Sequence, residues 1–154
     1  MKRFLSCLLV LLALSCTKTI ETTIPYCPVY LELDLTFQDR ALKEMQAYKI
    51  YTQSNIDQDG ERTGFGGVLV YHGLNNNGGA GEAYYAFDAA CPYEAQVNIK
   101  VEVDENRIYA ICPKCGSKYE ILNGIGNPIE GPSKNYLQQY PVTPMGNKLY
   151  IRNY

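Results

Sequence analysis

The sequence predicts an all-β fold, a small antiparallel β-sandwich or barrel, and three observations support this prediction. Short segments of alternating apolar and polar residues recur along the chain, and turn signals separate them at regular spacing. No segment shows the long 3.6-residue period of an amphipathic helix. The chain has 14 tyrosines and no tryptophan, and aromatic residues favour strands. A chain of 154 residues can bury one core, so we expect a single domain.

The clearest strand is predicted over residues 29–37, because Val29, Leu31, Leu33, Leu35 and Phe37 all fall on one face. A single helical turn follows at residues 38–45, and a polar loop is expected at 54–63. The other strands are predicted over residues 46–52, 67–72, 83–88, 96–103, 107–111, 118–122, 137–143 and 148–153.

Turn residues connect these strands. The glycine-rich stretch 75–81 is predicted to be a hairpin tip, and it does not join a strand to a helix as a phosphate-binding loop would. Shorter turns are predicted at residues 104–106, at Asn123-Gly124 and at residues 145–147.

Residues 1–15 are predicted to be a signal peptide. Two basic residues precede an apolar run that is shorter than the about 20 residues of a membrane-spanning helix. The run ends in Ala13-Leu14-Ser15-Cys16, which resembles the lipobox of bacterial lipoproteins. This resemblance implies lipid attachment at Cys16, a polar tether over 16–27, a domain over 28–154 and a place in the bacterial cell envelope. An ordinary secretory signal is the alternative.

The charge of the chain argues against a nucleic-acid partner. Removing Lys2 and Arg3 from the 14 basic residues leaves 12 against 16 acidic residues, so the mature net charge is −4. There is no basic cluster, and membrane contact is expected only through the lipid anchor. No Ser/His/Asp arrangement or paired carboxylates are present, so we predict no enzymatic role beyond that of an electron-transfer component.

Two cysteine–proline turns carry the chemistry. The first knuckle is Cys91-Pro92-Tyr93, and the second knuckle runs from Cys112 to Ser117 and reads C-P-K-C-G-S. A C-P-x-C-G turn points its two sulfurs at one spot, which suits metal ligation and also a short-loop disulfide. The site is therefore expected at Cys91, Cys112 and Cys115.

These features resemble those of a Rieske iron–sulfur domain. From Cys112 to Glu120 the chain reads C-P-K-C-G-S-K-Y-E beside a family pattern C-P-x-H-G-S-x-[YF]-[DE], and the first knuckle stands where the family has C-x-H. Further matches follow in the family's order at Asn123-Gly124, Gly131-Pro132 and Tyr140-Pro141-Val142, so the resemblance covers residues 66–152. It implies a Rieske-like fold with a two-knuckle cluster-binding subdomain, electron transfer through a 2Fe–2S cluster, and a redox partner. It also implies a cover loop, placed here at Gly131, Pro132 and Ser133.

The ligand set departs from the family. A Rieske cluster needs two histidines, but Tyr93 and Cys115 stand at the two histidine positions. The single histidine, His72, lies outside both knuckles and is predicted to be a loop or edge residue. A 2Fe–2S centre with two histidine ligands therefore cannot form.

Three interpretations of the site remain open. In an oxidising compartment, Cys91 and Cys112 or Cys112 and Cys115 would pair, leaving a cofactor-free, disulfide-stapled binding or structural module. Alternatively, the three thiolates hold one zinc or iron ion, with Tyr93, water or Cys27 in the fourth position. In the third, a 2Fe–2S cluster is bound by the three cysteines and an unusual fourth ligand. A thiol–disulfide oxidoreductase is less favoured, because C-P-K-C lacks the βαβ context of such enzymes.

Overall fold

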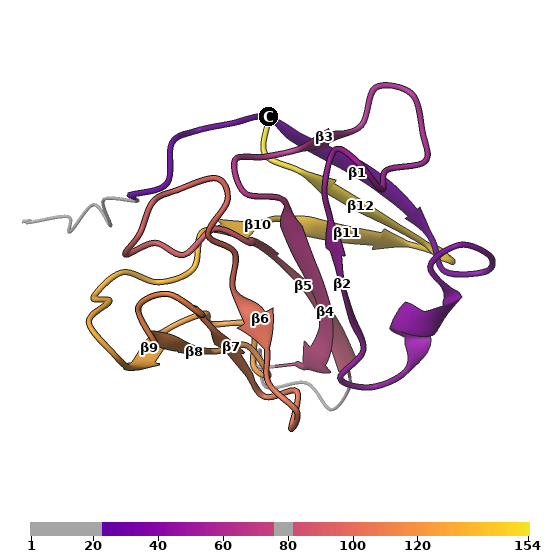
Figure 1. The fold of residues 1–154 in the computed structure, drawn as a ribbon. Helices are drawn as coiled ribbons and strands as arrows, with labels where there is room; N and C mark the ends of the chain where they lie inside the picture. The colour runs from indigo at the N-terminus through magenta and orange to yellow at the C-terminus, as the bar shows by residue number, and fades with distance from the viewer. Residues whose placement is uncertain (1–22, 76–81) are drawn as a thin grey trace, which may run out of the picture.

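The computed structural model describes residues 23–75 and 82–154. Its strands form three four-stranded antiparallel sheets (Figure 1), and the only helical element in the described part of the chain is a 3-10 helix, η2 (Arg40–Lys43). The predicted all-β fold is confirmed. No helix in the described ranges has the length and apolar character needed to cross a bilayer.

The first sheet brings the two ends of the domain together, with the strand order β11-β12-β1-β3. These strands are β1 (Val29–Asp34), β3 (Arg62–Thr63), β11 (Val142–Met145) and β12 (Lys148–Arg152). Leu31 pairs with Ile151 and Leu33 with Leu149, and all four side chains are buried. The alternation read from the sequence thus becomes the inner face of this sheet.

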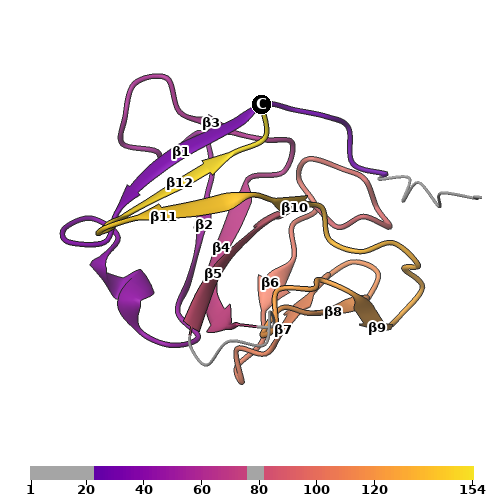
Figure 2. The same ribbon diagram turned by 180° about the vertical axis from the view of Figure 1, so that it is seen from behind.

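The second sheet lies in the middle of the molecule, with the order β10-β5-β4-β2 (Figure 2). Its strands are β2 (Tyr48–Tyr51), β4 (Val68–Leu74), β5 (Glu82–Asp88) and β10 (Gln139–Tyr140). In β4, Val68 and Val70 pack into the core shared with the first sheet, whereas Leu69 and Tyr71 pack into a second core. Because it is covered on both faces, β4 is apolar at nearly every position.

The third sheet carries the second knuckle and packs on the second core. Its order is β6-β7-β8-β9, with β6 (Glu102–Val103), β7 (Tyr109–Ile111), β8 (Lys118–Glu120) and β9 (Pro128–Glu130). The Leu74 N–H donates to the Leu122 carbonyl at 2.8 Å, and the Tyr71 hydroxyl donates to the Arg107 carbonyl at 2.6 Å. Both bonds attach this sheet to β4.

Several predicted elements differ from the observed ones. Phe37 was expected on the buried face, but the strand ends at Asp34 and Phe37 is 74% exposed in the turn before η2. Only the last two residues of the predicted strand 96–103 form β6, because the preceding residues form turns around the first knuckle. Pro141 divides the predicted strand 137–143 into β10 and β11, which belong to different sheets.

Two short strands were not predicted. β3 lies at the end of the predicted loop 54–63, and β9 lies where no element was predicted, because two or three residues give too little alternation to recognise. Most of the predicted hairpin tip 75–81 lies outside the described residues, as do the predicted signal peptide and Cys16.

Candidate metal centre

Backbone hydrogen bonds shape the two knuckles. In the first, the Cys91 N–H donates to the Ile99 carbonyl at 3.0 Å, and the Ala95 N–H donates back to the Cys91 carbonyl at 2.9 Å. In the second, the Cys112 N–H donates to the Ser117 carbonyl at 2.8 Å, and the Gly116 N–H donates to the Cys112 carbonyl at 3.0 Å. Gly116 has φ +72°, a conformation that favours glycine and closes this tight turn.

The fold brings the three predicted cysteines together. The sulfur atoms of Cys91, Cys112 and Cys115 all lie within 4.8 Å of one another, and the Cys91 and Cys115 Sγ atoms are 3.7 Å apart. Cys91 and Cys112 are fully buried within the second core, whereas Cys115 is half-buried. The four described cysteines, these three and Cys27, carry no disulfide. We call Cys91, Cys112 and Cys115 the sulfur triad.

Hydroxyl groups contact two sulfurs of the triad. The Tyr119 hydroxyl lies 3.4 Å from the Cys91 Sγ, and the Cys115 thiol donates to the Ser117 Oγ at 3.1 Å. Tyr119 and Ser117 are both fully buried. Such polar contacts to ligand atoms orient the ligands and tune a bound metal.

The two cysteines of the second knuckle differ in acidity. Burial raises the pKa of the Cys112 thiol to about 12. Burial raises the pKa of the Cys115 thiol, but hydrogen bonds to its thiolate from the side chain and backbone of Ser117, and then from Cys112 and Cys91, outweigh burial and lower that pKa below 9.0. Burial, and next the contact with Cys91, raise the pKa of Tyr119 well above its ordinary value. Cys115 is thus the thiol of this knuckle that ionises more readily, and Tyr119 stays a neutral phenol.

The loop at Gly131, Pro132 and Ser133 packs on the second knuckle. The Ser133 N–H donates to the Ser117 Oγ at 3.1 Å. Gly131 has φ +89°, and a Cβ on it would lie 2.5 Å from the Ser117 Cα. Only glycine allows so close an approach, so this loop lies directly behind the serine that bonds Cys115.

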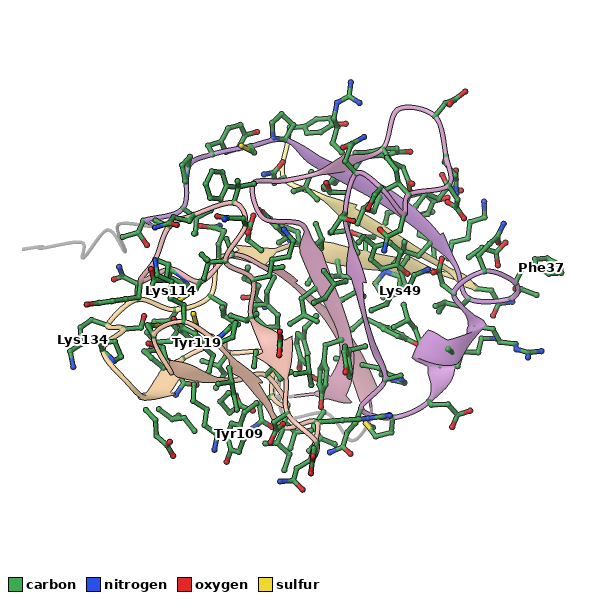
Figure 3. The ribbon with its side chains drawn as sticks, viewed as in Figure 1. Phe37, Lys49, Tyr109, Lys114, Tyr119 and Lys134 are labelled. Atoms are coloured by element: carbon green, nitrogen blue, oxygen red, sulfur yellow. The ribbon has the colours of Figure 1, made fainter. Side chains whose placement is uncertain are left out.

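Two contacts hold the knuckle tips. The Lys114 ammonium of the second knuckle pairs with the Glu94 carboxylate beside the first knuckle at 2.6 Å. The Thr23 hydroxyl donates to the Pro92 carbonyl at 2.6 Å, and Ile24 is 5% exposed. Within the predicted tether, Thr23 therefore contacts the first knuckle and the Ile24 side chain is buried, whereas Pro25 and Tyr26 are exposed. In Figure 3, Lys114 and Tyr119 lie at the end of the molecule opposite Phe37.

Asp88 at the end of β5 organises the approach to the first knuckle. Its buried carboxylate accepts from the N–H groups of Phe65 at 3.0 Å, Gly66 at 3.0 Å and Ala90 at 2.8 Å, and from the Tyr140 hydroxyl at 2.7 Å. Burial raises the pKa of this carboxyl despite the four donors. Asp88 thus fixes the chain three residues before Cys91.

Other predicted site residues lie elsewhere. Tyr93, a predicted fourth ligand, is 55% exposed, and the hydroxyl beside a triad sulfur belongs to Tyr119 instead. Cys27 is not part of the triad; its carbonyl accepts from the Asn153 side chain at 2.9 Å.

His72 was wrongly predicted to be a loop or edge residue. It is buried in the interior strand β4, its Nδ1 lies 3.1 Å from the Glu44 carbonyl, and its ring stacks on Tyr84. The metal-ligating groups that the described residues bring together are the three cysteines alone. A Rieske 2Fe–2S centre with two histidine ligands therefore does not fit this site.

Sequence reasoning missed Tyr119 and Asp88 as parts of the site. The aromatic position two residues after Ser117 was noted only as a feature of the motif. In β8, the apolar Tyr119 stands between the charged residues Lys118 and Glu120, and this alternation is the signal that could have identified Tyr119 as a buried residue. No local signal marks Asp88. One of the donors to its carboxylate, Ala90, is two residues away, but Gly66 and Tyr140 lie 22 and 52 residues away in the chain.

Comparison with known proteins gives fold-level similarities. No family model and no curated protein match this chain. Among solved structures, the plasma membrane Rieske protein of the cyanobacterium Synechocystis matches 57% of this chain and 78% of its own, with 22% identity and a TM-score of 0.44. The complex of reduced oxygenase and oxidized ferredoxin in carbazole 1,9a-dioxygenase contains a second match. The match covers 80% of the present chain and 93% of the chain in that complex, with 15% identity and a TM-score of 0.46.

A ferredoxin of Sphingomonas yanoikuyae covers 64% of this chain and 82% of its own, with 18% identity and a TM-score of 0.40. All three similarities have an identity of 22% or less and a TM-score below 0.5. The chemistry of the site therefore follows from the sulfur triad and its surroundings.

Proposed function

We propose that this chain is an exported bacterial lipoprotein whose domain holds one metal ion through the thiolates of Cys91, Cys112 and Cys115, and that it serves electron transfer at the cell envelope. The single observation that supports a metal is the sulfur triad, three unbridged sulfurs within 4.8 Å of one another. Thiolates are the ligands that soft metal ions select.

The spacing of the triad favours one ion over a cluster. With metal–sulfur bonds of about 2.3 Å, two sulfurs on a tetrahedral ion are about 3.8 Å apart. The Cys91–Cys115 separation is 3.7 Å. A 2Fe–2S cluster instead divides its ligands between two irons. The fourth position of a single ion would go to solvent, since burial raises the pKa of Tyr119 and a neutral phenol would donate to the Cys91 thiolate instead of binding the ion.

Electron transfer requires a redox-active ion at this site, and we propose iron, because zinc has no redox chemistry. The surroundings suit an electron carrier: two sulfurs are buried, hydroxyls contact the sulfurs, and Cys115 lies near the surface between the knuckle tips. Hydrogen bonding to sulfur and solvent exposure are the means by which proteins set the potential of iron–thiolate centres. A structural zinc site is the second candidate, since C-P-x-C-G knuckles serve both metals.

The test is metal analysis of the full chain, purified in detergent without oxygen. We expect about one iron per chain, no acid-labile sulfide, and a visible absorption band that disappears reversibly on reduction. Cys91→Ser, Cys112→Ser and Cys115→Ser should each lose the metal, and the matched control Cys27→Ser should retain it.

The other results separate the remaining candidates. Stoichiometric zinc would assign a structural centre, and iron with labile sulfide would assign a cluster; either overturns the single-iron carrier. Metal-free protein with a disulfide within the triad would leave a cofactor-free module. The lipid anchor is tested separately by mass spectrometry of the mature N-terminus, where Cys16→Ser should abolish lipidation.

A further inference from the structure

Cys91 and Cys115 stand in the arrangement of a reactive thiol and its resolving partner. They belong to different knuckles, yet their sulfurs are 3.7 Å apart. A disulfide has an S–S length of about 2.05 Å, so a shift of less than 2 Å would join them. The pair differs from the two pairings that the sequence suggested, which both include Cys112.

Exposure separates the roles of the two thiols. Cys115 is half-buried, whereas Cys91 and Cys112 have no exposed surface. A reagent from solution therefore meets the Cys115 sulfur first. The Cys91 sulfur lies behind it, within reach of any adduct formed there.

The surrounding contacts keep the two sulfurs facing each other. The Lys114–Glu94 ion pair joins the tips of the two knuckles at 2.6 Å, and the Thr23 hydroxyl holds the first knuckle at Pro92. These contacts involve neither sulfur, so they can persist in both redox states of the pair.

We propose that Cys91 and Cys115 form a reversible disulfide by exchange with small-molecule disulfides, and that this reaction releases the metal. The inference rests on the proposed metal site, because the same two sulfurs would supply two of its three thiolate ligands. A site left with Cys112 alone could not hold the ion.

The exchange proceeds in two balanced steps. The Cys115 thiolate attacks one sulfur of the small disulfide, forming a mixed disulfide and breaking the original S–S bond to release one thiolate. The Cys91 thiolate then attacks the Cys115 Sγ, forming the Cys91–Cys115 bond and releasing the second thiolate. The protons of the two protein thiols pass to these two products. The two cysteine sulfurs are oxidised as the small disulfide is reduced.

The experiment uses the full chain with Cys27→Ser, metal-free and then treated with oxidised glutathione. Peptide mapping should find Cys91 linked to Cys115, and dithiothreitol should reverse the link. In Cys91→Ser the reaction should stop at a glutathione adduct on Cys115, whereas in Cys112→Ser the Cys91–Cys115 link should still form. These two variants show whether Cys91 is the resolving thiol, whatever their effect on metal binding.

A parallel titration with Fe²⁺ or Zn²⁺ compares the reduced and oxidised chains. We expect at least a hundredfold loss of affinity on oxidation and its recovery with dithiothreitol. The proposal is overturned if another pair forms, if no disulfide forms, or if the oxidised chain binds metal as well as the reduced one. A reduced chain that takes up no metal contradicts the proposed function instead. The peptide map then still decides whether Cys91 and Cys115 are a redox pair.

Discussion

The hydroxyl of Tyr119 lies 3.4 Å from the Sγ of Cys91, although 28 residues separate the two in the chain. Tyr119 projects from β8 into the second core, and Cys91 is the first residue of the first knuckle, which follows β5. The contact therefore joins the third sheet to the first knuckle at the sulfur itself. Five predictions concern this contact and the groups around the two knuckles.

Tyr119→Phe should lower the reduction potential of the bound metal while leaving the fold intact. A donor to sulfur stabilises the more negative, reduced state of the centre, and Phe removes that donor at nearly constant volume. The change should be on the order of tens of mV, since about 1.4 kcal/mol corresponds to 59 mV for one electron. Redox titration with optical detection measures it.

The control for this substitution is Tyr93→Phe, which removes an exposed hydroxyl beside the same knuckle. Its potential should match that of the wild type. Equal shifts in both variants would show that the Tyr119 hydroxyl does not tune the centre.

Gly131→Ala should destabilise the domain and weaken metal retention. The new Cβ would lie 2.5 Å from the Ser117 Cα, in addition to the strain of φ +89°. We expect a loss of about 2–4 kcal/mol in the free energy of unfolding, combining overpacking with backbone strain. Urea denaturation measures the loss, and metal competition with a chelator measures retention.

Gly60→Ala is the matched control, because Gly60 has φ +90° and nothing within 4 Å of an added Cβ. It should show the backbone strain of about 1 kcal/mol without the collision. If Gly131→Ala and Gly60→Ala lower the free energy of unfolding equally, the collision with Ser117 does not contribute to the loss of stability.

Asp88→Ala should lower the free energy of unfolding by about 3–5 kcal/mol, because it leaves the buried N–H groups of Gly66 and Ala90, the part-buried N–H of Phe65 and the buried Tyr140 hydroxyl without their acceptor. The exposed Asp59 provides the control, and Asp59→Ala should stay within about 0.5 kcal/mol of the wild type. Chemical denaturation of both variants checks this.

The same carboxyl predicts a pH dependence. Its pKa is raised in the folded state above 3.8, so the folded chain binds its proton more tightly than the unfolded chain. This group's contribution to stability is therefore fully present below pH 3.8 and declines as the pH rises through the folded pKa. Asp88→Ala should lack that decline, and an identical pH profile in the two proteins would contradict the assignment.

Cys115 should be the first thiol of the triad to react with iodoacetamide in the reduced, metal-free chain. Its lowered pKa makes it ionise below pH 9.0, whereas Cys112 is buried and its pKa is raised to about 12. The alkylation rate at Cys115, followed by peptide mass mapping between pH 6 and 10, should reach its midpoint below pH 9.0. Faster labelling of Cys112 would reverse the assigned order of acidity.

Much of the fold could be read from local patterns. The alternation in residues 29–35 gave β1 and its buried face, because a pleated strand places every second side chain on the same side. The turn residues before β7 and between β11 and β12 gave two hairpins. Local patterns failed where an element is too short, as in β3, or where one proline moves the chain between sheets, as at Pro141.

For the site, the sequence by itself determined that Cys112 and Cys115 share a knuckle, because only two residues separate them and the turn between them brings their sulfurs together. It also determined that no pair of histidines is available. The tertiary structure alone decided that Cys91 faces Cys115, that Tyr119 rather than Tyr93 contacts a sulfur, and that His72 lies in an interior strand. Those distances depend on the order of the strands and on how the third sheet packs against the second, and neither is set by residues adjacent in the chain.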